Sequence, residues 1–179
     1  MRPEQEALLD LRAISLYGLV DKEMQTYVED TLRYFVDQGS PDIMVFISSS
    51  GGDHCRSMRI CQALSDYPGK TVGYVQIQAY SGAVTILQGC TIRKMRLGAE
   101  LMIHEPSLSD RLSLSELKNA ELIKRLTADL EDCFEELCIL FSGRSGRHTP
   151  QYFADQCHKG TNITAEEALQ MGLVDEIAS

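Results

Sequence analysis

The sequence lacks several features that would assign it to a broad class. None of its apolar runs is long enough to cross a membrane, and residues 1–11 lack the apolar core of a signal peptide. No glycine-rich or proline-rich linker, internal repeat or low-complexity segment divides the 179 residues. We therefore expect a single domain over residues 1–179, located in the cytoplasm.

Positive charge is also scarce. The chain has 17 Lys and Arg against 26 Asp and Glu, a formal net charge of −9, which argues against nucleic acid or an anionic membrane as the main partner. The six cysteines form no C-x-x-C pair. His54 adjoins Cys55 and His158 adjoins Cys157, but neither pair has zinc-ligand spacing on both sides. The sequence therefore predicts free, buried thiols and no metal or organic cofactor.

Strand-like and helix-like segments alternate in the first half of the chain. The predicted strands cover residues 13–19, 43–47 and 71–77, and the predicted helices cover 21–37, 55–65 and a segment starting at 81. The strand at 43–47 is apolar throughout, which is typical of a strand buried on both faces, and residues 48–53 read as a loop. Short strands are predicted around residues 98 and 99. This order predicts an α/β fold with a mostly parallel sheet and right-handed βαβ units.

The second half is dominated by a long helix predicted over about residues 114–141. Ser113 and Glu116 form a capping box at its start, and Gly143 is predicted to end it. Apolar residues follow at helical spacing: Leu122, Leu126, Leu130, Phe134, Leu137 and Phe141. A helix this long is unusual in a domain of this size, so we expect it to project or to pack against another subunit. Further helices are predicted from Pro150 and from residue 164, the latter capped by Gly172.

Residues that suit acyl-transfer chemistry follow neighbouring strands. Gly51 and Gly52 follow the strand at 43–47, Ser81 follows the next strand, and His104 ends a short strand at 101–104. Groups beyond the carboxyl ends of parallel strands gather at one edge of the sheet. A serine nucleophile, a histidine base and glycine N–H donors would form such a site there. The structural alternatives are a helix-capping serine, an ordinary half-buried histidine and a tight glycine turn.

Several motifs resemble the Clp protease proteolytic subunit family of self-compartmentalising serine peptidases. The family pattern Ile-Asn-Ser-Pro-Gly-Gly corresponds to Ile-Ser-Ser-Ser-Gly-Gly at 47–52, and Met-Ile-His-Gln-Pro corresponds to Met-Ile-His-Glu-Pro at 102–106. The closing pattern corresponds to Thr-Ala-Glu-Glu-Ala at 164–168 and Gly-Leu-Val-Asp at 172–175. The long helix matches the family's "handle", through which two rings interlock. The resemblance covers residues 12–177.

The resemblance implies a serine peptidase subunit with a ClpP/crotonase-like fold. Ser81 would be the nucleophile, His104 the base, and the N–H groups of Gly52 and Gly82 the oxyanion hole. A peptide or unfolded polypeptide would lie extended along the Gly51 loop, inside a chamber of stacked homo-oligomeric rings, alone or mixed with a paralogue. An ATP-driven unfoldase is the implied partner, although only about eleven residues precede the first strand.

The sequence departs from the family pattern at two places. The family's Ala-Ser-x-Gly-Ala reads Ala-Tyr-Ser-Gly-Ala at 79–83, so Tyr80 competes with Ser81 for the nucleophile position. A phenol with a pKa of about 10 is a poor nucleophile, and the spacing from Gly52 favours Ser81. The family's triad aspartate falls on Gly160, and Asp155 and Asn162 are the nearest polar substitutes.

These departures leave other functions open. A catalytically impaired or inactive paralogue would assemble as the family does and act as a structural or regulatory subunit. A weaker alternative is an acyl-CoA-binding relative with a crotonase-like fold, which also uses paired backbone N–H groups. The distance from Ser81 Oγ to His104 Nε2 is the observation that bears most directly on catalysis.

Overall fold

Strands and helices alternate over the first half of the structure, as the sequence predicts. The computed structural model describes residues 8–108 and 112–178. Its first elements are β1 (Ala13–Val20), α2 (Lys22–Asp37), β2 (Ile43–Gly52), α3 (His54–Asp66), β3 (Thr71–Tyr80) and α4 (Gly82–Gln88). Asp21 caps α2 as predicted, its carboxylate accepting from the Met24 N–H. Residues 1–7, 109–111 and 179 lie outside the described residues. They include most of the segment 1–11, which is predicted to lack the apolar core of a signal peptide.

The described strands form one mostly parallel sheet. Its main order is β1-β2-β3-β4-β7, where β4 is Ile92–Arg96 and β7 is Glu176–Ala178. Beyond β4, the end of β3 pairs with β5 (Glu100–Met102), which pairs antiparallel with β6 (Asn162–Ile163). The other strand pairs are parallel. This arrangement confirms the predicted α/β fold with βαβ units.

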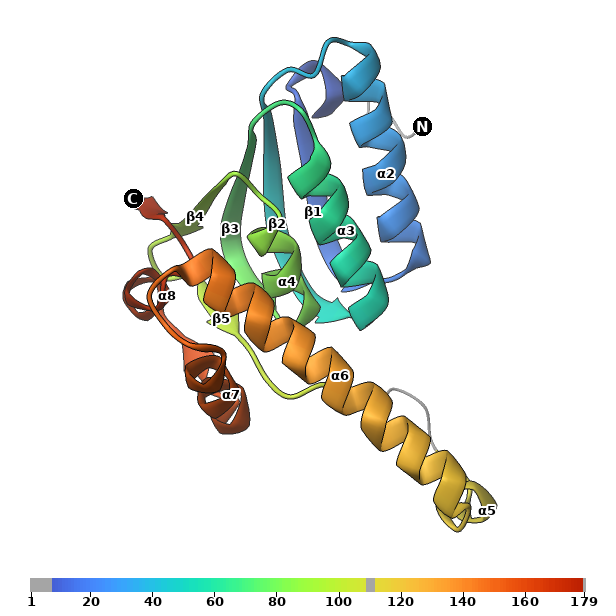
Figure 1. The fold of residues 1–179 in the computed structure, drawn as a ribbon. Coiled ribbons are helices and arrows are strands. Elements are labelled where there is room, and N and C mark those ends of the chain that lie inside the picture. The colour runs from blue at the N-terminus through green and yellow to red at the C-terminus, as the bar shows by residue number, and fades with distance from the viewer. Residues whose placement is uncertain (1–7, 109–111, 179) are drawn as a thin grey trace.

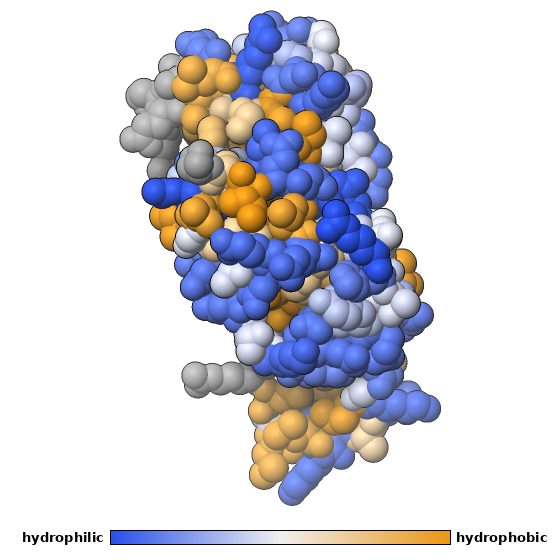
Figure 2. Space-filling view, turned by 90° about the vertical axis from the view of Figure 1, so that its left-hand side faces the viewer, coloured by the Kyte–Doolittle hydropathy of each residue, from blue (hydrophilic) through white to orange (hydrophobic). Residues whose placement is uncertain are grey.

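The two faces of the sheet differ in how they are covered. Helices α2, α3 and α4 lie on one face (Figure 1), and the strand residues that point to them, such as Ile14, Val45 and Val75, are fully buried. Alternate residues on the other face are only half-buried, including Phe46 and Tyr74, whose rings meet edge to face at 6.2 Å. Figure 2 looks onto this side of the molecule and shows apolar side chains gathered among hydrophilic ones.

The predicted long helix exists but has different bounds. Residues 114–141 do not form one helix, because the chain turns after α5 (Leu114–Leu117) and α6 runs over Ala120–Ser145. The Asn119 side chain accepts from the Leu122 N–H and caps α6. The helix passes through Gly143 and ends at Gly146, whose φ of 62° allows the left-handed cap. Figure 1 shows α5 and the start of α6 extending away from the body of the molecule.

The loop predicted at residues 48–53 is mostly strand. Strand β2 continues to Gly52 and pairs with β1, which itself continues past Gly18 to Val20 after a register shift. Ser49 explains this extension, because its hydroxyl donates to the Gly18 carbonyl at 2.6 Å and accepts from the Gly51 N–H at 3.1 Å. A polar side chain thus satisfies the backbone groups that the irregular register leaves unpaired.

The remaining helices lie on the left of Figure 1, below the C-terminus. Helix α7 spans Pro150–Lys159, and α8 spans Ala165–Met171 and ends at Gly172 as predicted. In the apolar stripe of α6, Leu137 and Phe141 are buried, whereas Leu122, Leu126 and Leu130 near the projecting end are only half-buried. The part of α6 next to the body therefore belongs to the core, and the projecting part does not.

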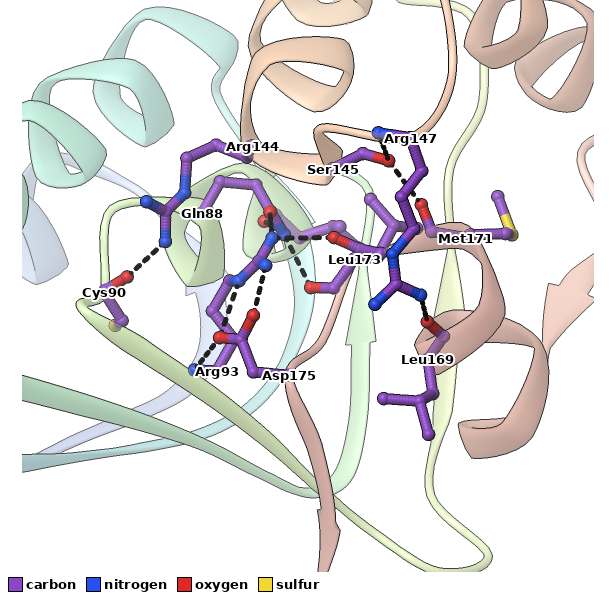
Figure 3. A network of polar contacts seen from close by, with 12 residues as sticks. Gln88, Cys90, Arg93, Arg144, Ser145, Arg147, Leu169, Met171, Leu173 and Asp175 are labelled. Carbon is purple, nitrogen blue, oxygen red and sulfur yellow. Dashed lines mark hydrogen bonds and ion pairs between the residues drawn. The ribbon is translucent and has the colours of Figure 1, made fainter.

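A buried polar network fixes the far end of α4 (Figure 3). Gln88, the last residue of α4, donates to the Leu173 carbonyl at 3.2 Å and accepts from Arg93 at 2.6 Å. Arg93, only 4% exposed, also donates to the Gly172 carbonyl and forms a two-pronged ion pair with Asp175. The network joins α4 to the segment before β7. Since α4 starts beside Ser81, this anchor helps to position that residue.

Candidate active site

The carboxyl ends of three strands meet at one edge of the sheet, as the sequence predicts. Ala79 near the end of β3 is in register with Ser49 on β2 and with Leu101 on β5. The residues that follow each strand end therefore lie close together. These residues include Gly51, Ser81 and His104, which all line one cleft of about 640 Å³.

Ser81 and His104 are within hydrogen-bonding distance. Ser81 Oγ lies 2.9 Å from His104 Nε2. Ser81 occupies the N-cap position of α4, but its side chain makes no capping hydrogen bond, so the hydroxyl contacts His104 instead. Its φ of 53° and ψ of −124° place it in a strained turn, and its N–H donates to the Met102 carbonyl at 2.7 Å. The turn presents the hydroxyl to the cleft, where strain often accompanies function.

The other nitrogen of the His104 ring contacts a backbone carbonyl. His104 Nδ1 lies 2.5 Å from the carbonyl oxygen of Glu105. Because a carbonyl oxygen only accepts hydrogen bonds, Nδ1 must carry the hydrogen in the neutral ring. The lone pair of Nε2 then faces Ser81 and can accept its proton.

The residues considered as substitutes for the triad acid form hydrogen bonds with side chains other than His104. Asp155 on α7 accepts from Gln151, and Asn162 on β6 donates to Glu100. Among the described residues, no carboxylate is hydrogen-bonded to the His104 ring. Gly160 caps α7 in the left-handed conformation, with φ of 57°. Neither Asp155 nor Asn162 is therefore hydrogen-bonded to His104, and each pairs with another side chain instead.

Tyr80 is directed to a different partner from Ser81. Its hydroxyl donates to Glu100 Oε2 at 2.8 Å, the same oxygen to which Asn162 donates. The hydrogen bond to Glu100 is the main cause that raises the pKa of the Tyr80 phenol, followed by burial and the nearby negative charge. A raised pKa makes the phenol a still weaker nucleophile at neutral pH, and the contact to His104 belongs to Ser81.

The glycines around Ser81 let neighbouring segments of the chain pack closely together. A Cβ at Gly51 (φ +83°) would lie 2.8 Å from Ser81 Cβ and 3.0 Å from the Gly82 nitrogen. A Cβ at Gly82 would lie 2.1 Å from Ser57 Oγ and 3.6 Å from the Gly52 nitrogen. The backbone of Gly52 therefore lies beside that of Gly82. The Gly82 N–H, at the first position of α4, has no acceptor within its helix.

The cleft has an apolar wall that the sequence reasoning treated only as packing. Leu137 and Phe141 of α6 line the cleft, as does Thr85 of α4. The helical spacing of the apolar residues in α6 indicates which face of the helix is buried. It does not show which of these residues line a cleft. Glu105 was also missed as the residue whose carbonyl contacts His104, since any residue type supplies a carbonyl.

The cysteines are free thiols. Cys61, Cys90, Cys138 and Cys157 are buried as predicted, whereas Cys55 is exposed and Cys133 is half-buried. Burial raises the pKa of Cys90 and of Cys157 to about 12, so these two thiols stay protonated and unreactive.

The histidines next to cysteines pair with carboxylates. His54 lies 3.3 Å from Glu136, and His158 lies 2.9 Å from Glu105. Within residues 8–108 and 112–178, no three His, Cys, Asp or Glu side chains gather in a way that could hold a metal ion. In the same part of the chain, no helix is long and apolar enough to span a membrane.

Comparisons with known proteins agree with this architecture. A model described as Clp protease matches residues 3–179. Among solved structures, a point mutant of ClpP1 from Listeria monocytogenes superposes with a TM-score of 0.85 at 18% sequence identity, over 98% of this chain and 96% of that chain. No curated protein gave a significant match. Because the family match spans nearly the whole chain, the protein belongs to the Clp protease family.

Proposed function

We propose that the protein is a serine peptidase subunit that hydrolyses peptide bonds with Ser81 and His104. The observation that carries this proposal is the 2.9 Å distance between Ser81 Oγ and His104 Nε2. Membership of the Clp protease family supports the same reaction class. The substrate is a peptide or an unfolded polypeptide, and the reaction needs no metal or organic cofactor.

The reaction follows from the two contacts of the His104 ring. Ser81 Oγ attacks the carbonyl carbon of the scissile bond, while His104 Nε2 takes the hydroxyl proton and then passes it to the leaving amine. A water molecule hydrolyses the acyl-enzyme with the same base. Throughout, Nδ1 keeps its hydrogen and donates it to the Glu105 carbonyl, and this hydrogen bond holds the ring in one orientation.

Backbone N–H groups of two glycines stabilise the negative charge that develops on the attacked carbonyl oxygen. The N–H groups of Gly52 and Gly82 serve as the oxyanion hole, since the two backbones are adjacent and both line the cleft. Gly51 lets the end of β2 pack closely against the Tyr80–Gly82 backbone. The substrate is an extended peptide whose main chain adds along the end of β2 in the cleft.

Labelling with a fluorophosphonate probe tests the proposal. The probe forms a covalent bond only with an activated serine, so the wild type should be labelled and Ser81→Ala should not. His104→Ala is the matched control, because it leaves the hydroxyl in place but removes its base. An unlabelled wild-type protein that is folded and assembled would rule out the peptidase.

A second candidate is a catalytically inactive paralogue with a structural or regulatory role. It is favoured by one observation: no described carboxylate is hydrogen-bonded to the His104 ring. An imidazolium without a carboxylate partner is less stable, which slows proton transfer. The labelling experiment separates the two candidates, since the inactive subunit would assemble normally and remain unlabelled.

The proposal includes assembly into rings. The face of the sheet opposite helices α2, α3 and α4 is only half-buried, whereas parallel sheets are normally covered on both faces. Leu114 and Leu117 of α5 are 67% and 55% exposed at the projecting tip, where Figure 2 shows a second apolar patch. These surfaces suit contacts between copies within a ring and between stacked rings. The enclosed sites then receive substrate from an ATP-driven unfoldase.

Sedimentation of a tip variant tests the stacking. Leu117→Glu places a charge in the proposed ring–ring contact, so it should reduce the sedimentation coefficient of the particle. Val36→Glu changes another exposed apolar residue, on α2 (45% exposed, against 55% for Leu117), and should leave the particle intact. Equal sedimentation of Leu117→Glu and the wild type would contradict stacking through α5.

A further inference from the structure

Glu105, the residue after the catalytic base, makes two contacts with histidines. Its main-chain carbonyl accepts from His104 Nδ1, and its carboxylate Oε1 lies 2.9 Å from Nδ1 of His158. His158 is in the last turn of α7, a helix that contributes no group to the proposed reaction. Both side chains of this second pair are about half-exposed, at 52% and 56%. Glu105 therefore connects the orientation of the His104 ring to the position of α7.

The backbone around the Glu105 carbonyl gives it no other support. Residues 104–106 form no hydrogen bond with another backbone group within the described part of the chain. Pro106 has no N–H, so the peptide group that carries this carbonyl has no donor with which to anchor itself. Side-chain contacts, from His104 to Ser81 and from Glu105 to His158, hold this loop instead. Loss of the contact with His158 would let the carbonyl turn away from the His104 ring.

The His158 ring is itself held in place by packing. Its centre lies 5.5 Å from that of the Phe134 ring on α6, at an interplanar angle of 54°. Phe134 packs against the hydrophobic core, and α6 and α7 also meet through the buried rings of Phe141 and Phe153. A ring that is already confined loses little further conformational entropy when it pairs with a carboxylate. His158 therefore presents Nδ1 to Glu105 from a fixed position.

We propose that His158 is a positioning residue for the catalytic base: its pairing with the Glu105 side chain holds the Glu105 carbonyl against Nδ1 of His104. The inference rests on the proposed function, which assigns His104 as the base. Among the described residues, His158 forms no hydrogen bond with Ser81 or with the His104 ring, so it acts only through Glu105. Nδ1 of a histidine can donate to a carboxylate from the neutral ring as well as from the protonated one. The structural alternative is a pair that only fastens α7 to the loop after β5.

Variants of His158 test the assignment through the rate of fluorophosphonate labelling and through kcat and KM for one peptide. A half-exposed ion pair can bias the carbonyl only modestly, so His158→Ala should lower the labelling rate and kcat about three- to fivefold and leave KM unchanged. His158→Asn places an amide N–H near the position of Nδ1 and should restore most of the rate. Lys159→Ala is the matched control, because it removes a neighbouring charge that contacts Gln156 rather than Glu105. It should match the wild type.

A double variant distinguishes positioning from a structural role. Glu105→Ala keeps the main-chain carbonyl but removes the carboxylate, so it should lose as much activity as His158→Ala. Because His158 acts only through Glu105, the double variant should lose no more than either single variant. All three melting temperatures should stay close to that of the wild type, since the pair is half-exposed. Losses that multiply in the double variant, or a His158→Ala rate equal to that of Lys159→Ala, would overturn the proposal.

Solid-state NMR separates this proposal from the peptidase activity. Protein with ¹³C- and ¹⁵N-labelled histidine is measured at a pH where imidazole is neutral, and His104→Ala identifies the signals of His104. The His104 ring should show one tautomer, with its hydrogen on Nδ1, in Ser81→Ala and both tautomers in Ser81→Ala/His158→Ala. This result supports the positioning role even if the wild type proves inactive. A single Nδ1–H tautomer in both proteins overturns it even if the wild type is an active peptidase.

Discussion

His104 donates its Nδ1 hydrogen to the main-chain carbonyl of Glu105, the next residue in the chain. In serine proteases with a full triad, replacing the aspartate by asparagine lowers kcat about 10⁴-fold, because asparagine holds the imidazole in the wrong tautomer. The Glu105 carbonyl only accepts, so it imposes the correct tautomer. It lacks a full negative charge, so it stabilises the imidazolium less than an aspartate would. The carbonyl therefore replaces the orienting role of the acid but only part of its electrostatic role.

This relationship predicts that the acid candidates from the sequence are dispensable. Asp155→Ala and Asn162→Ala should each change the rate of fluorophosphonate labelling less than about threefold, because neither side chain contacts His104. His104→Ala should lower the rate about a thousandfold or more. Labelling rates under identical probe concentrations provide the comparison. A hundredfold loss in either acid-candidate variant would mean that this side chain reaches His104 during the reaction.

The variant Tyr80→Phe tests whether Ser81 or Tyr80 is the nucleophile. The variant loses the hydrogen bond to Glu100, which should cost about 1 kcal/mol of stability. Its labelling should remain, because the contact to His104 comes from Ser81. Mass spectrometry of the labelled peptide locates the adduct. An adduct on Tyr80 in the wild type, absent from Tyr80→Phe, would contradict the assignment of Ser81.

The sequence was sufficient for the mostly parallel sheet whose strand ends place Ser81 beside His104. Apolar runs and helix caps mark the strand–helix alternation, and parallel strands bring their carboxyl ends together. The bounds of the long helix were wrong because local signals compete there. Ser113 and Glu116 do form a capping box, but it starts only the short α5, and Asn119 then starts α6.

Other parts of the site carry no local sequence signal. A backbone carbonyl such as that of Glu105 is present at every residue, so only the fold shows which one meets His104. Thr85 reads as one more residue in a buried helix, and only the fold shows that it lines the cleft. Leu137 and Phe141 follow the periodicity of core residues, and that periodicity does not separate packing from lining a cleft.

Gly51 should be more sensitive to substitution than its backbone conformation alone requires. Gly51 and Gly98 have nearly equal positive φ values, +83° and +85°, so alanine is similarly strained at both. A Cβ at Gly98 meets nothing within 4 Å, whereas at Gly51 it would lie 2.4 Å from the Tyr80 carbonyl oxygen and 2.8 Å from Ser81 Cβ. Gly98→Ala should cost about 1 kcal/mol and leave labelling intact.

Gly51→Ala should cost more stability and reduce the labelling rate at least about tenfold, because Ser81 must shift away from His104. Chemical denaturation and probe labelling of both variants give the comparison. If the two variants lose the same stability and keep the same labelling rate, the close approach of Gly51 to Ser81 has no functional importance.

The ion pair between Arg93 and Asp175 should make stability depend on pH. Burial opposes ionisation of the Asp175 carboxyl, but the hydrogen bonds and charge of Arg93 outweigh it and lower its pKa below the usual value. A carboxyl with a lowered pKa in the folded state stabilises the protein above its unfolded-state pKa of about 3.9. That contribution is lost as the pH falls through the folded-state pKa.

Asp175→Asn should therefore destabilise the protein by about 2 kcal/mol at pH 7, less than a fully buried pair, since the carboxylate is 39% exposed. The difference from the wild type should begin to narrow as the pH falls below the unfolded-state pKa of about 3.9 and should disappear below the lowered folded-state pKa, where the Asp175 carboxyl is neutral in both states. Glu176→Gln is the matched control: its partner Lys94 is at 2.6 Å, but the carboxylate is 53% exposed, so the cost should stay below about 1 kcal/mol. Urea unfolding at pH 7 and pH 3, at one protein concentration, measures both. A cost for Asp175→Asn that is equal at the two pH values would show that the network in Figure 3 acts through shape rather than through the charge of Asp175.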